Sequence, residues 1–567
     1  MRCLLIAFLL FAAPLQAEFA GKLWYEVKGE GPPLVLLHDG LAPSGTWDAQ
    51  MPAFSRLFRT VRYDRRGYGR SEAATEPFSD LDDLHMLMDT LKIERAVLVG
   101  CSNGAKLAVD YALAHPERVG SLVLVGPVVS GLPYSVHFER RGIENFLPMF
   151  RDKSADGLIE AWVRDPYILD PASTRARTQL RELLKGSPNP LVNRGAPRSS
   201  EAERPAIGRL SEIKVPTLIL VGASDIPDVH AHAGALEAGI QGSRREVIRG
   251  AGHLIHLEQP DLFNETVLAA LRPEAAAADY LESLPEQNVD RKIFDYSPGP
   301  LDIQEAKTEM RGNVKVIDLS YESPLGGRVP SFLVLPAGEG RHPAVLYLHH
   351  GQGDRTTYLD EAVLMAERGI VSLVLGAPFT RPENQGENAG KPWEPVASRK
   401  EQVQGIVDVR RGFDLLAARP EVDPKRLAYV GHSYGATIGG TLAAVERRPL
   451  AHVLMAGLPS LTRSSTHGRD VRAAAFQVLI TTVAQKAYVD ALAPIDAVHW
   501  VGQAAPARLL FQFARRDAFI SPWDAEVFIQ AASDPKEVKW YDAGHFFEKH
   551  EQARKDRMDW LARVLGL

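Results

Sequence analysis

The hydrophobic pattern of the chain repeats once. Short continuous apolar runs alternate with longer segments that mix apolar and polar residues at helical spacing. Continuous apolar runs of four or five residues, bounded by turn-forming residues, are typical of strands buried on both faces of a parallel sheet. The runs lie at residues 34–37, 96–99 and 217–221 in the first half, and at 344–348, 427–430 and 509–513 in the second. The pattern predicts an α/β fold in each half, with a mostly parallel sheet flanked by helices.

Each half carries one G-x-S-x-G pentapeptide directly after a predicted strand and before a predicted helix. The pentapeptides are residues 100–104, centred on Ser102, and residues 431–435, centred on Ser433. A sharp strand-to-helix turn leaves no room for side chains beside the serine and holds its hydroxyl at the top of the sheet. The context predicts two nucleophilic serines.

A serine hydroxyl needs a base, and that base needs a carboxylate to orient it. In the first half His253 follows a strand-like segment, and Asp225 ends the preceding predicted strand. We predict the order Ser102, Asp225, His253, which is the order of α/β-hydrolase triads. Asp228, in the same loop, is the alternative acid.

The second half repeats the order with Ser433, Asp517 and His545. Asp517 precedes His545 by 28 positions, the same separation as between Asp225 and His253. The same Asp-to-His spacing in two separate segments, each with a predicted strand followed by a turn, argues against coincidence. Asp524 is the alternative acid, and Asp542 lies too close to His545 in sequence to orient it.

Backbone amides are predicted to stabilise the oxyanion that forms when the serine attacks. The amide after each nucleophile lies at a helix N-terminus, where the helix dipole favours negative charge. These amides belong to Asn103 and Tyr434. The second amide of each site is assigned to the turn after the first strand, at Gly40 and Gln352, with His350 taken as the counterpart of His38.

Both halves resemble known families in these motifs. Residues 20–272 resemble lid-bearing esterases and lactonases of the α/β-hydrolase family, including enol-lactonase-like members. Residues 290–567 resemble dienelactone hydrolase and acetyl-xylan-esterase-type enzymes, and also the catalytic domain of prolyl-oligopeptidase relatives. The motifs are 38–40 and 64–71 with the first triad, and 350–353 with the second. Dienelactone hydrolases proper use a cysteine, so Ser433 favours the esterase branch. The resemblance implies hydrolysis of carboxylic esters or lactones through an acyl-enzyme.

The predicted domain order places an α/β-hydrolase domain on each side of a linker. The expected segments are a signal peptide at 1–17, the first domain at 18–272, a linker at 273–289 and the second domain at 290–567. The first half has 39 more residues between nucleophile and acid than the second, and we expect a helical lid at about 131–210. This lid carries a small excess of Lys and Arg, which either favours an acidic substrate or forms a solvated face. The loop around 378–399 is longer in the second half, and its Trp393 either stacks on substrate or anchors the loop.

Composition limits localisation and partners. Arg2, the apolar run 3–13 and a small residue at Ala17 predict a secretory signal peptide, hence a periplasmic or secreted protein with no integral membrane span after cleavage. The alternative is that this segment is an N-terminal strand or anchor. A net charge of −6 without a basic block argues against nucleic-acid binding. We expect a small-molecule ester or lactone as partner, no cofactor and no metal, because His230 and His232 lack a third ligand nearby. The alternatives are that one half is a silent binding module, or that the second half cleaves peptides. The sequence carries no signal for an oligomeric state.

Overall fold

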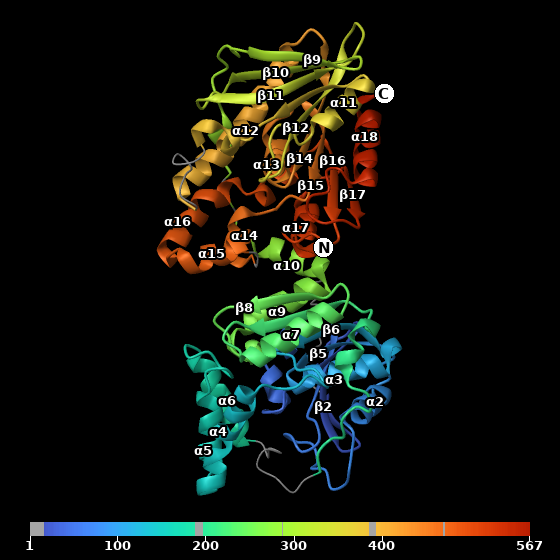
Figure 1. Ribbon diagram of the computed structural model, residues 1–567, viewed down its shortest axis with the longest axis vertical. Helices are drawn as coiled ribbons and strands as arrows, with labels where there is room; N and C mark the ends of the chain where they lie inside the picture. Colours follow the sequence, from blue (N-terminus) through green and yellow to red (C-terminus); the bar gives the residue numbers. More distant parts are fainter. Residues whose placement is uncertain (1–15, 187–196, 286, 288, 385–392, 469–470) are drawn as a thin grey trace, which may run out of the picture. The chain divides into compact units, whose positions relative to one another are not determined.

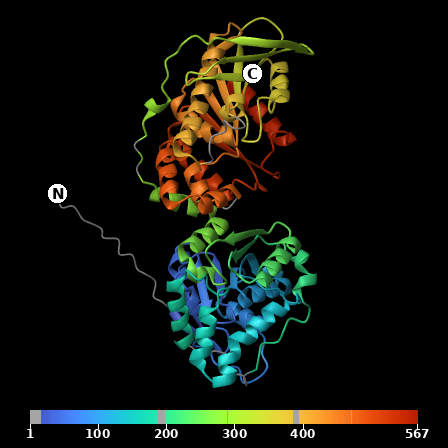
Figure 2. The same ribbon diagram turned by 60° about the vertical axis from the view of Figure 1, so that its left-hand side comes forward.

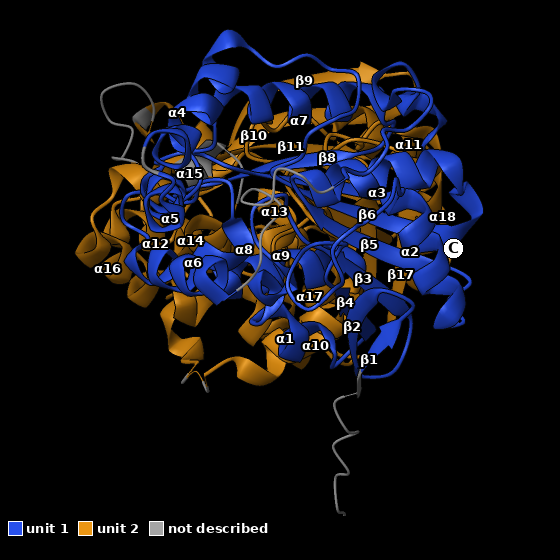
Figure 3. Cartoon of the chain, turned by 90° about the horizontal axis from the view of Figure 1, so that it is seen from below, with its two compact units in different colours: residues 1–271 blue, residues 272–567 orange. Residues whose placement is uncertain are grey.

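The chain forms two compact units, residues 1–271 and 272–567 (Figure 3). The computed structural model describes residues 16–186, 197–285, 287, 289–384, 393–468 and 471–567. Each unit contains a mostly parallel sheet flanked by helices. The predicted α/β class with two tandem sheets is confirmed.

The sheet of unit 1 has the strand order β1-β2-β4-β3-β5-β6-β7-β8. Strands β1 and β2 run antiparallel to their neighbours, and all pairings from β4 to β8 are parallel. The central strand β3 has four fully buried residues, Leu34 to Leu37, as its continuous apolar run predicts. The strands are β1 (Gln16–Ala20), β2 (Leu23–Lys28), β3 (Pro33–Leu37), β4 (Arg59–Tyr63), β5 (Ala96–Cys101), β6 (Val119–Val125), β7 (Thr217–Gly222) and β8 (Arg244–Ile248).

The helices of unit 1 include three that belong to the long insertion after β6. Helices α4, α5 and α6 follow one another and lie side by side (Figures 1 and 2). They fall within the predicted lid, of which residues 187–196 lie outside the described residues. The helices are α1 (Gln50–Phe54), α2 (Asp80–Thr90), α3 (Asn103–Ala114), α4 (Val136–Asp152), α5 (Ala155–Arg164), α6 (Thr174–Gly186), α7 (Pro227–Gly239), α8 (Ile255–Glu258) and α9 (Pro260–Leu271).

The sheet of unit 2 repeats this arrangement with one additional antiparallel strand at its edge. Its order is β17-β16-β15-β14-β12-β13-β11-β10-β9, with parallel pairings from β13 to β17. Strands β12 and β14 therefore occupy the places of β3 and β5. The strands are β9 (Gln304–Arg311), β10 (Val314–Glu322), β11 (Arg328–Leu335), β12 (His342–Leu348), β13 (Val371–Leu375), β14 (Val422–His432), β15 (Pro449–Met455), β16 (Arg508–Ala514) and β17 (Lys536–Tyr541).

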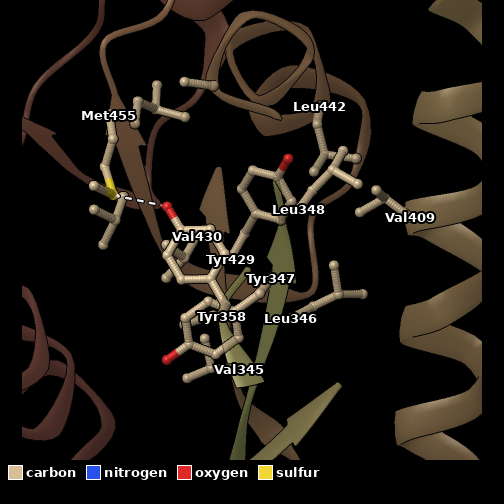
Figure 4. Close-up of a cluster of buried hydrophobic side chains, with 14 of the residues drawn as sticks. Val345, Leu346, Tyr347, Leu348, Tyr358, Val409, Tyr429, Val430, Leu442 and Met455 are labelled. Carbon is tan, nitrogen blue, oxygen red and sulfur yellow. Dashed lines mark hydrogen bonds between the residues drawn. The ribbon is translucent and has the colours of Figure 1, made fainter. Parts of the chain in front are cut away.

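Helices cover both faces of the second sheet. Helices α12 and α13 pack on one face, and α11 and α18 lie on the other (Figure 1). Apolar and aromatic side chains fill the interior, where the Tyr358 hydroxyl contacts the Met455 sulfur at 3.4 Å (Figure 4). The helices are α10 (Pro273–Ser283), α11 (Leu359–Glu367), α12 (Pro395–Ala418), α13 (Tyr434–Val445), α14 (Leu461–His467), α15 (Val471–Leu479), α16 (Thr482–Leu492), α17 (Pro522–Ala531) and α18 (Glu551–Leu565).

The segment predicted as a linker, 273–289, is largely helix α10. This helix belongs to unit 2, where it packs on α17. The Tyr280 and Trp523 rings meet edge to face at 5.1 Å, and the Arg463 guanidinium lies over both rings. The alanine-rich composition was interpreted as a linker, but alanine is also the best helix former, and Tyr280 gives the helix a contact to bury.

Two segments of the sequence prediction, the signal peptide and the long loop of the second half, lie partly outside the described residues. All of the predicted signal peptide except Gln16 and Ala17 lies outside the described residues, as do residues 385–392 of the long loop. Trp393 packs edge to face on Phe476 of α15, with 5.8 Å between ring centroids. This contact is the loop-anchoring arrangement. In the described parts of the chain, no helix is long and apolar enough to cross a membrane.

Candidate active sites

Both predicted nucleophiles lie in the strained strand-to-helix turn expected of them. Ser102 stands between β5 and α3 with φ 53° and ψ −114°, and Ser433 stands between β14 and α13 with φ 52° and ψ −105°. A positive φ is costly for a residue with a side chain and persists only where surrounding structure enforces it. Strain of this kind at the carboxyl end of a central strand is the nucleophile-elbow geometry.

The glycines of each pentapeptide are explained by close backbone approach. A Cβ added to Gly100 would lie 2.3 Å from the Gly104 carbonyl oxygen, and one added to Gly431 would lie 2.3 Å from that of Gly435. A Cβ on Gly104 or Gly435 would clash with the carbonyl of the neighbouring strand, at 2.2 and 2.3 Å. The turn therefore admits no other residue at these positions without moving backbone.

The second site is a continuous chain of hydrogen bonds. His545 Nε2 lies 2.9 Å from Ser433 Oγ, and His545 Nδ1 lies 2.9 Å from the Asp517 carboxylate. Asp517 is further held by the backbone amides of Phe519 and Ile520. Hydroxyl, imidazole and carboxylate stand in the order that moves a proton off the serine.

The rival acids of the second site have other roles. The Asp524 carboxylate accepts from Ser521 in the capping box of α17. Asp542 is exposed and forms an ion pair with Arg516. Asp517 is thus the carboxylate that contacts His545.

The first site is assembled in part. His253 Nδ1 lies 2.8 Å from Asp225 Oδ2. Asp228 instead accepts from the backbone amide and hydroxyl of Ser135, the N-cap residue of lid helix α4. Among the described residues, no hydrogen bond joins Ser102 Oγ to His253. Catalytic hydrogen bonds are often long in unliganded enzymes and shorten when substrate binds.

Electrostatics near His253 favour its protonated form. Burial lowers the pKa of His253, but the charge of Asp225 and its hydrogen bond outweigh burial, so the net pKa is raised. Asp39 adds to this effect from the turn after β3. The base of the first site therefore loses its proton at a higher pH than an ordinary histidine.

The turns after the first parallel strand reveal a register error in the sequence prediction. His38 and His349 each follow directly on a strand, and each ring Nε2 accepts from a backbone amide, of Arg65 and Ala377, at 3.0 Å. His349, not His350, is the counterpart of His38. Consequently Gly351 stands where Gly40 stands, and Gln352 was predicted one residue too far along the chain.

Contacts around these turns agree with that register. The Gln352 amide donates to His350 Nδ1 at 3.3 Å, as the Leu41 amide donates to Asp39 Oδ1. The Gly40 backbone lies against the Asn103 side chain, where a Cβ would meet Asn103 Nδ2 at 2.3 Å. Tyr434 begins α13, as predicted for the second amide donor. The end of strand β12 at Leu348 is the sequence signal that would have identified Gly351.

Asp39 and Cys101 are two buried side chains in unit 1, and Cys101 directly precedes the first nucleophile. Burial raises the pKa of Asp39, against the stabilising amides of Ala42 and Leu41. Burial also raises the pKa of the Cys101 thiol, which is fully enclosed. A thiol with this environment packs as a small apolar group rather than acting as a nucleophile.

Comparison with known proteins shows to which family the chain belongs. The alpha/beta hydrolase fold family matches residues 32–260, and the Prolyl oligopeptidase family matches residues 356–567. A 2-hydroxy-6-oxononadienedioate/2-hydroxy-6-oxononatrienedioate hydrolase of Pseudomonas putida is 30% identical over 276 residues, covering 46% of this chain and 96% of that protein. The chain belongs to the α/β-hydrolase family.

Two further proteins are similar to part of this chain. A 2-hydroxy-6-oxo-6-phenylhexa-2,4-dienoate hydrolase of Comamonas testosteroni is 29% identical, with 44% of this chain and 90% of that protein covered. The crystal structure of carboxylesterase CesB from Bacillus subtilis matches 46% of this chain and 92% of its own, at 25% identity and a TM-score of 0.38. The two family models, over residues 32–260 and 356–567, agree with two tandem α/β-hydrolase units in one chain.

Proposed function

We propose that this α/β hydrolase is an exported serine hydrolase that cleaves carboxylic ester or lactone bonds at two sites. The observation that carries the proposal is the hydrogen-bonded chain from Ser433 through His545 to Asp517. The proposed first site is Ser102, His253 and Asp225. Export rests on the N-terminal charge and hydrophobicity pattern alone.

The proposed reaction runs in two halves. His545 Nε2 accepts the Ser433 proton as Oγ bonds to the ester carbonyl carbon, and the Tyr434 and Gly351 amides stabilise the oxyanion. The tetrahedral intermediate collapses, His545 gives the proton to the departing alkoxide, and an acyl-serine remains. Water then donates its proton to His545 and attacks the acyl carbon, and a second collapse releases the acid and returns the proton to Ser433.

A fluorophosphonate probe followed by peptide mass mapping tests both sites in the full chain. Adducts on Ser102 and Ser433 support two catalytic sites. An adduct on Ser433 alone contradicts the proposal for unit 1 and favours a silent binding module there. Ser102→Ala and Ser433→Ala, measured with p-nitrophenyl esters of increasing acyl length and with lactones, assign each substrate to a unit. Fractionation of expressing cells tests export.

A second candidate function applies to unit 2 only. The match of residues 356–567 to the Prolyl oligopeptidase family favours peptide hydrolysis. The same triad mechanism applies to either reaction, because an acyl-serine intermediate forms from an ester and from an amide. Hydrolysis of dipeptidyl anilides, abolished in Ser433→Ala and retained in Ser102→Ala, would favour the peptidase over the esterase.

A further inference from the structure

Three side chains that are able to ligate a metal ion lie close together next to the nucleophile elbow of unit 2. His350, His432 and Glu548 each offer one ligand atom, and these atoms all lie within 4.8 Å of one another. They come from three segments: the turn after β12, the end of β14 and the loop that follows His545. His432 is fully buried and His350 is 8% exposed.

Two of these atoms face each other as acceptors. His432 Nε2 lies 2.9 Å from the His545 carbonyl oxygen and must donate to it, so the lone pair of the neutral ring is on Nδ1. Nδ1 and Glu548 Oε2 are 3.7 Å apart, and both atoms are buried without a hydrogen-bond partner among the described residues. Buried polar atoms are nearly always satisfied, and two lone pairs in opposition call for a positive group between them.

The separation suits a metal ion. Bonds of about 2.1 Å from one ion to an imidazole nitrogen and a carboxylate oxygen span 3.7 Å at an angle of roughly 120°, close to tetrahedral or five-coordinate geometry. His350 supplies the third ligand. Its Nδ1 accepts a 3.3 Å hydrogen bond from the Gln352 amide, so an ion bound at that nitrogen would compete with this long contact.

One surrounding charge, that of Arg557, opposes a cation at His432. Arg557, which donates to the Glu548 carbonyl oxygen, is paired with Glu361 by two hydrogen bonds at its Nε, 2.8 and 3.0 Å long. That pair is neutral overall, so the Glu548 carboxylate gives the site its net charge. Two imidazoles and one carboxylate form a donor set that suits Zn²⁺ and similar divalent ions.

We propose that His350, His432 and Glu548 bind one divalent transition-metal ion of the Zn²⁺ class. The ion ties together the oxyanion turn, the strand that delivers Ser433 and the loop that carries His545. Its role is to position these three segments, since the triad itself needs no metal. The inference stands independently of which bond the triad cleaves.

The test uses the untagged full chain, stripped with a chelator and titrated with Zn²⁺ by calorimetry. We expect one saturable site per chain in the wild type. Glu548→Gln, which keeps shape and removes the charge, should weaken it at least about 100-fold. Glu551→Gln, at the exposed start of α18, is the matched control and should leave it unchanged. Elemental analysis of unstripped protein gives a second readout that does not depend on activity.

Equal Zn²⁺ binding by wild type and Glu548→Gln would overturn the proposal, because the ion would then bind elsewhere on the chain. No saturable binding would overturn it as well, leaving a water molecule between the two acceptors. If Glu548→Gln fails to fold, as judged by circular dichroism, His350→Gln removes a ligand from a different segment and decides the question. Loss of binding in that variant supports the site, and retained binding contradicts it.

Discussion

His545 Nε2 lies 2.9 Å from the Ser433 hydroxyl oxygen, so the proton acceptor of unit 2 is in bonding distance before any substrate arrives. The carboxylate of Asp517 holds the other ring nitrogen. In unit 1 the corresponding imidazole is held by Asp225, but Ser102 is not hydrogen-bonded to it in the described structure. The two units share the chain order Ser, Asp and His and differ in whether the serine is hydrogen-bonded to the imidazole.

Asp517→Asn should lower kcat for unit 2 substrates by about 10⁴-fold with little change in folding, because the imidazole loses its orienting charge and takes the wrong tautomer. Steady-state kinetics in a Ser102→Ala background measures it. Asp524→Asn is the matched control and should retain activity, at a cost of about 1 kcal/mol from the weakened capping box. Equal losses in the two variants would contradict the assignment of the acid.

The two carboxylates after β7 are expected to have different roles, Asp225 in catalysis and Asp228 in holding lid helix α4. Asp225→Asn should reduce kcat in unit 1 by several orders of magnitude. Asp228→Asn weakens the hold on Ser135 at the start of α4 and should chiefly raise KM, because α4 belongs to the predicted lid and Asp228 does not contact His253. Kinetics in a Ser433→Ala background distinguish the two. A KM effect from Asp225→Asn with kcat intact would reverse the assignment.

The pH profile of unit 1 should show an acidic limb above the ordinary histidine pKa of about 6.5, because the net pKa of His253 is raised. The neutral imidazole is the base, so activity appears only as pH rises through that value. Replacing Asp39 by Asn removes one charge that raises this pKa and should move the limb to lower pH. An unchanged limb in Asp39→Asn would show that this carboxyl is protonated and carries no charge.

The same raised pKa has a consequence for stability. Folding strengthens proton binding at His253, so this contribution is complete below the unfolded pKa and is lost as pH rises through the folded value. Thermal unfolding of wild type and His253→Gln across pH 5 to 8 measures it. The difference in melting temperature between them should shrink as pH rises.

Gly435→Ala should abolish unit 2 activity or prevent its folding. The added Cβ would lie 2.3 Å from the Leu348 carbonyl oxygen, and backbone cannot give way as a side chain can. Gly299→Ala is the control, since beyond its chain neighbours no atom of the described residues lies within 4 Å of a Cβ there. Expression, circular dichroism and ester hydrolysis report the outcome, and a fully active Gly435→Ala would contradict the elbow geometry.

Glu361→Gln should reduce the free energy of unfolding of unit 2 by about 3–5 kcal/mol, because it leaves the buried Arg557 charge uncompensated. Asp559→Asn breaks an exposed pair with Arg368 and should cost less than about 1 kcal/mol. Urea denaturation followed by tryptophan fluorescence measures both. A small effect from Glu361→Gln would mean that water reaches the guanidinium.

Sequence reasoning succeeded where local constraints act along the chain. Positive φ at Ser102 and Ser433 follows from glycines that only a tight turn requires. The equal spacing of Asp and His reflects one helix and one strand of similar length between them, α7 and β8 in unit 1 and α17 and β17 in unit 2. Prediction from the sequence failed where one segment was compatible with two interpretations. Because two consecutive histidines follow β12, the sequence did not show which of them corresponds to His38. In the alanine-rich stretch after residue 272, nothing indicated that Tyr280 would pack against the Trp523 ring.

The sequence by itself determined the α/β class, the two elbows and the order of triad residues, since apolar periodicity, glycine sterics and chain order are local properties. Only the tertiary structure decided between Asp225 and Asp228 and between Gly351 and Gln352, because a hydrogen bond forms through space between segments far apart in the chain. The same holds for His350, His432 and Glu548. Nothing in their positions along the chain indicates that a turn, a strand end and a loop bring these three side chains close together.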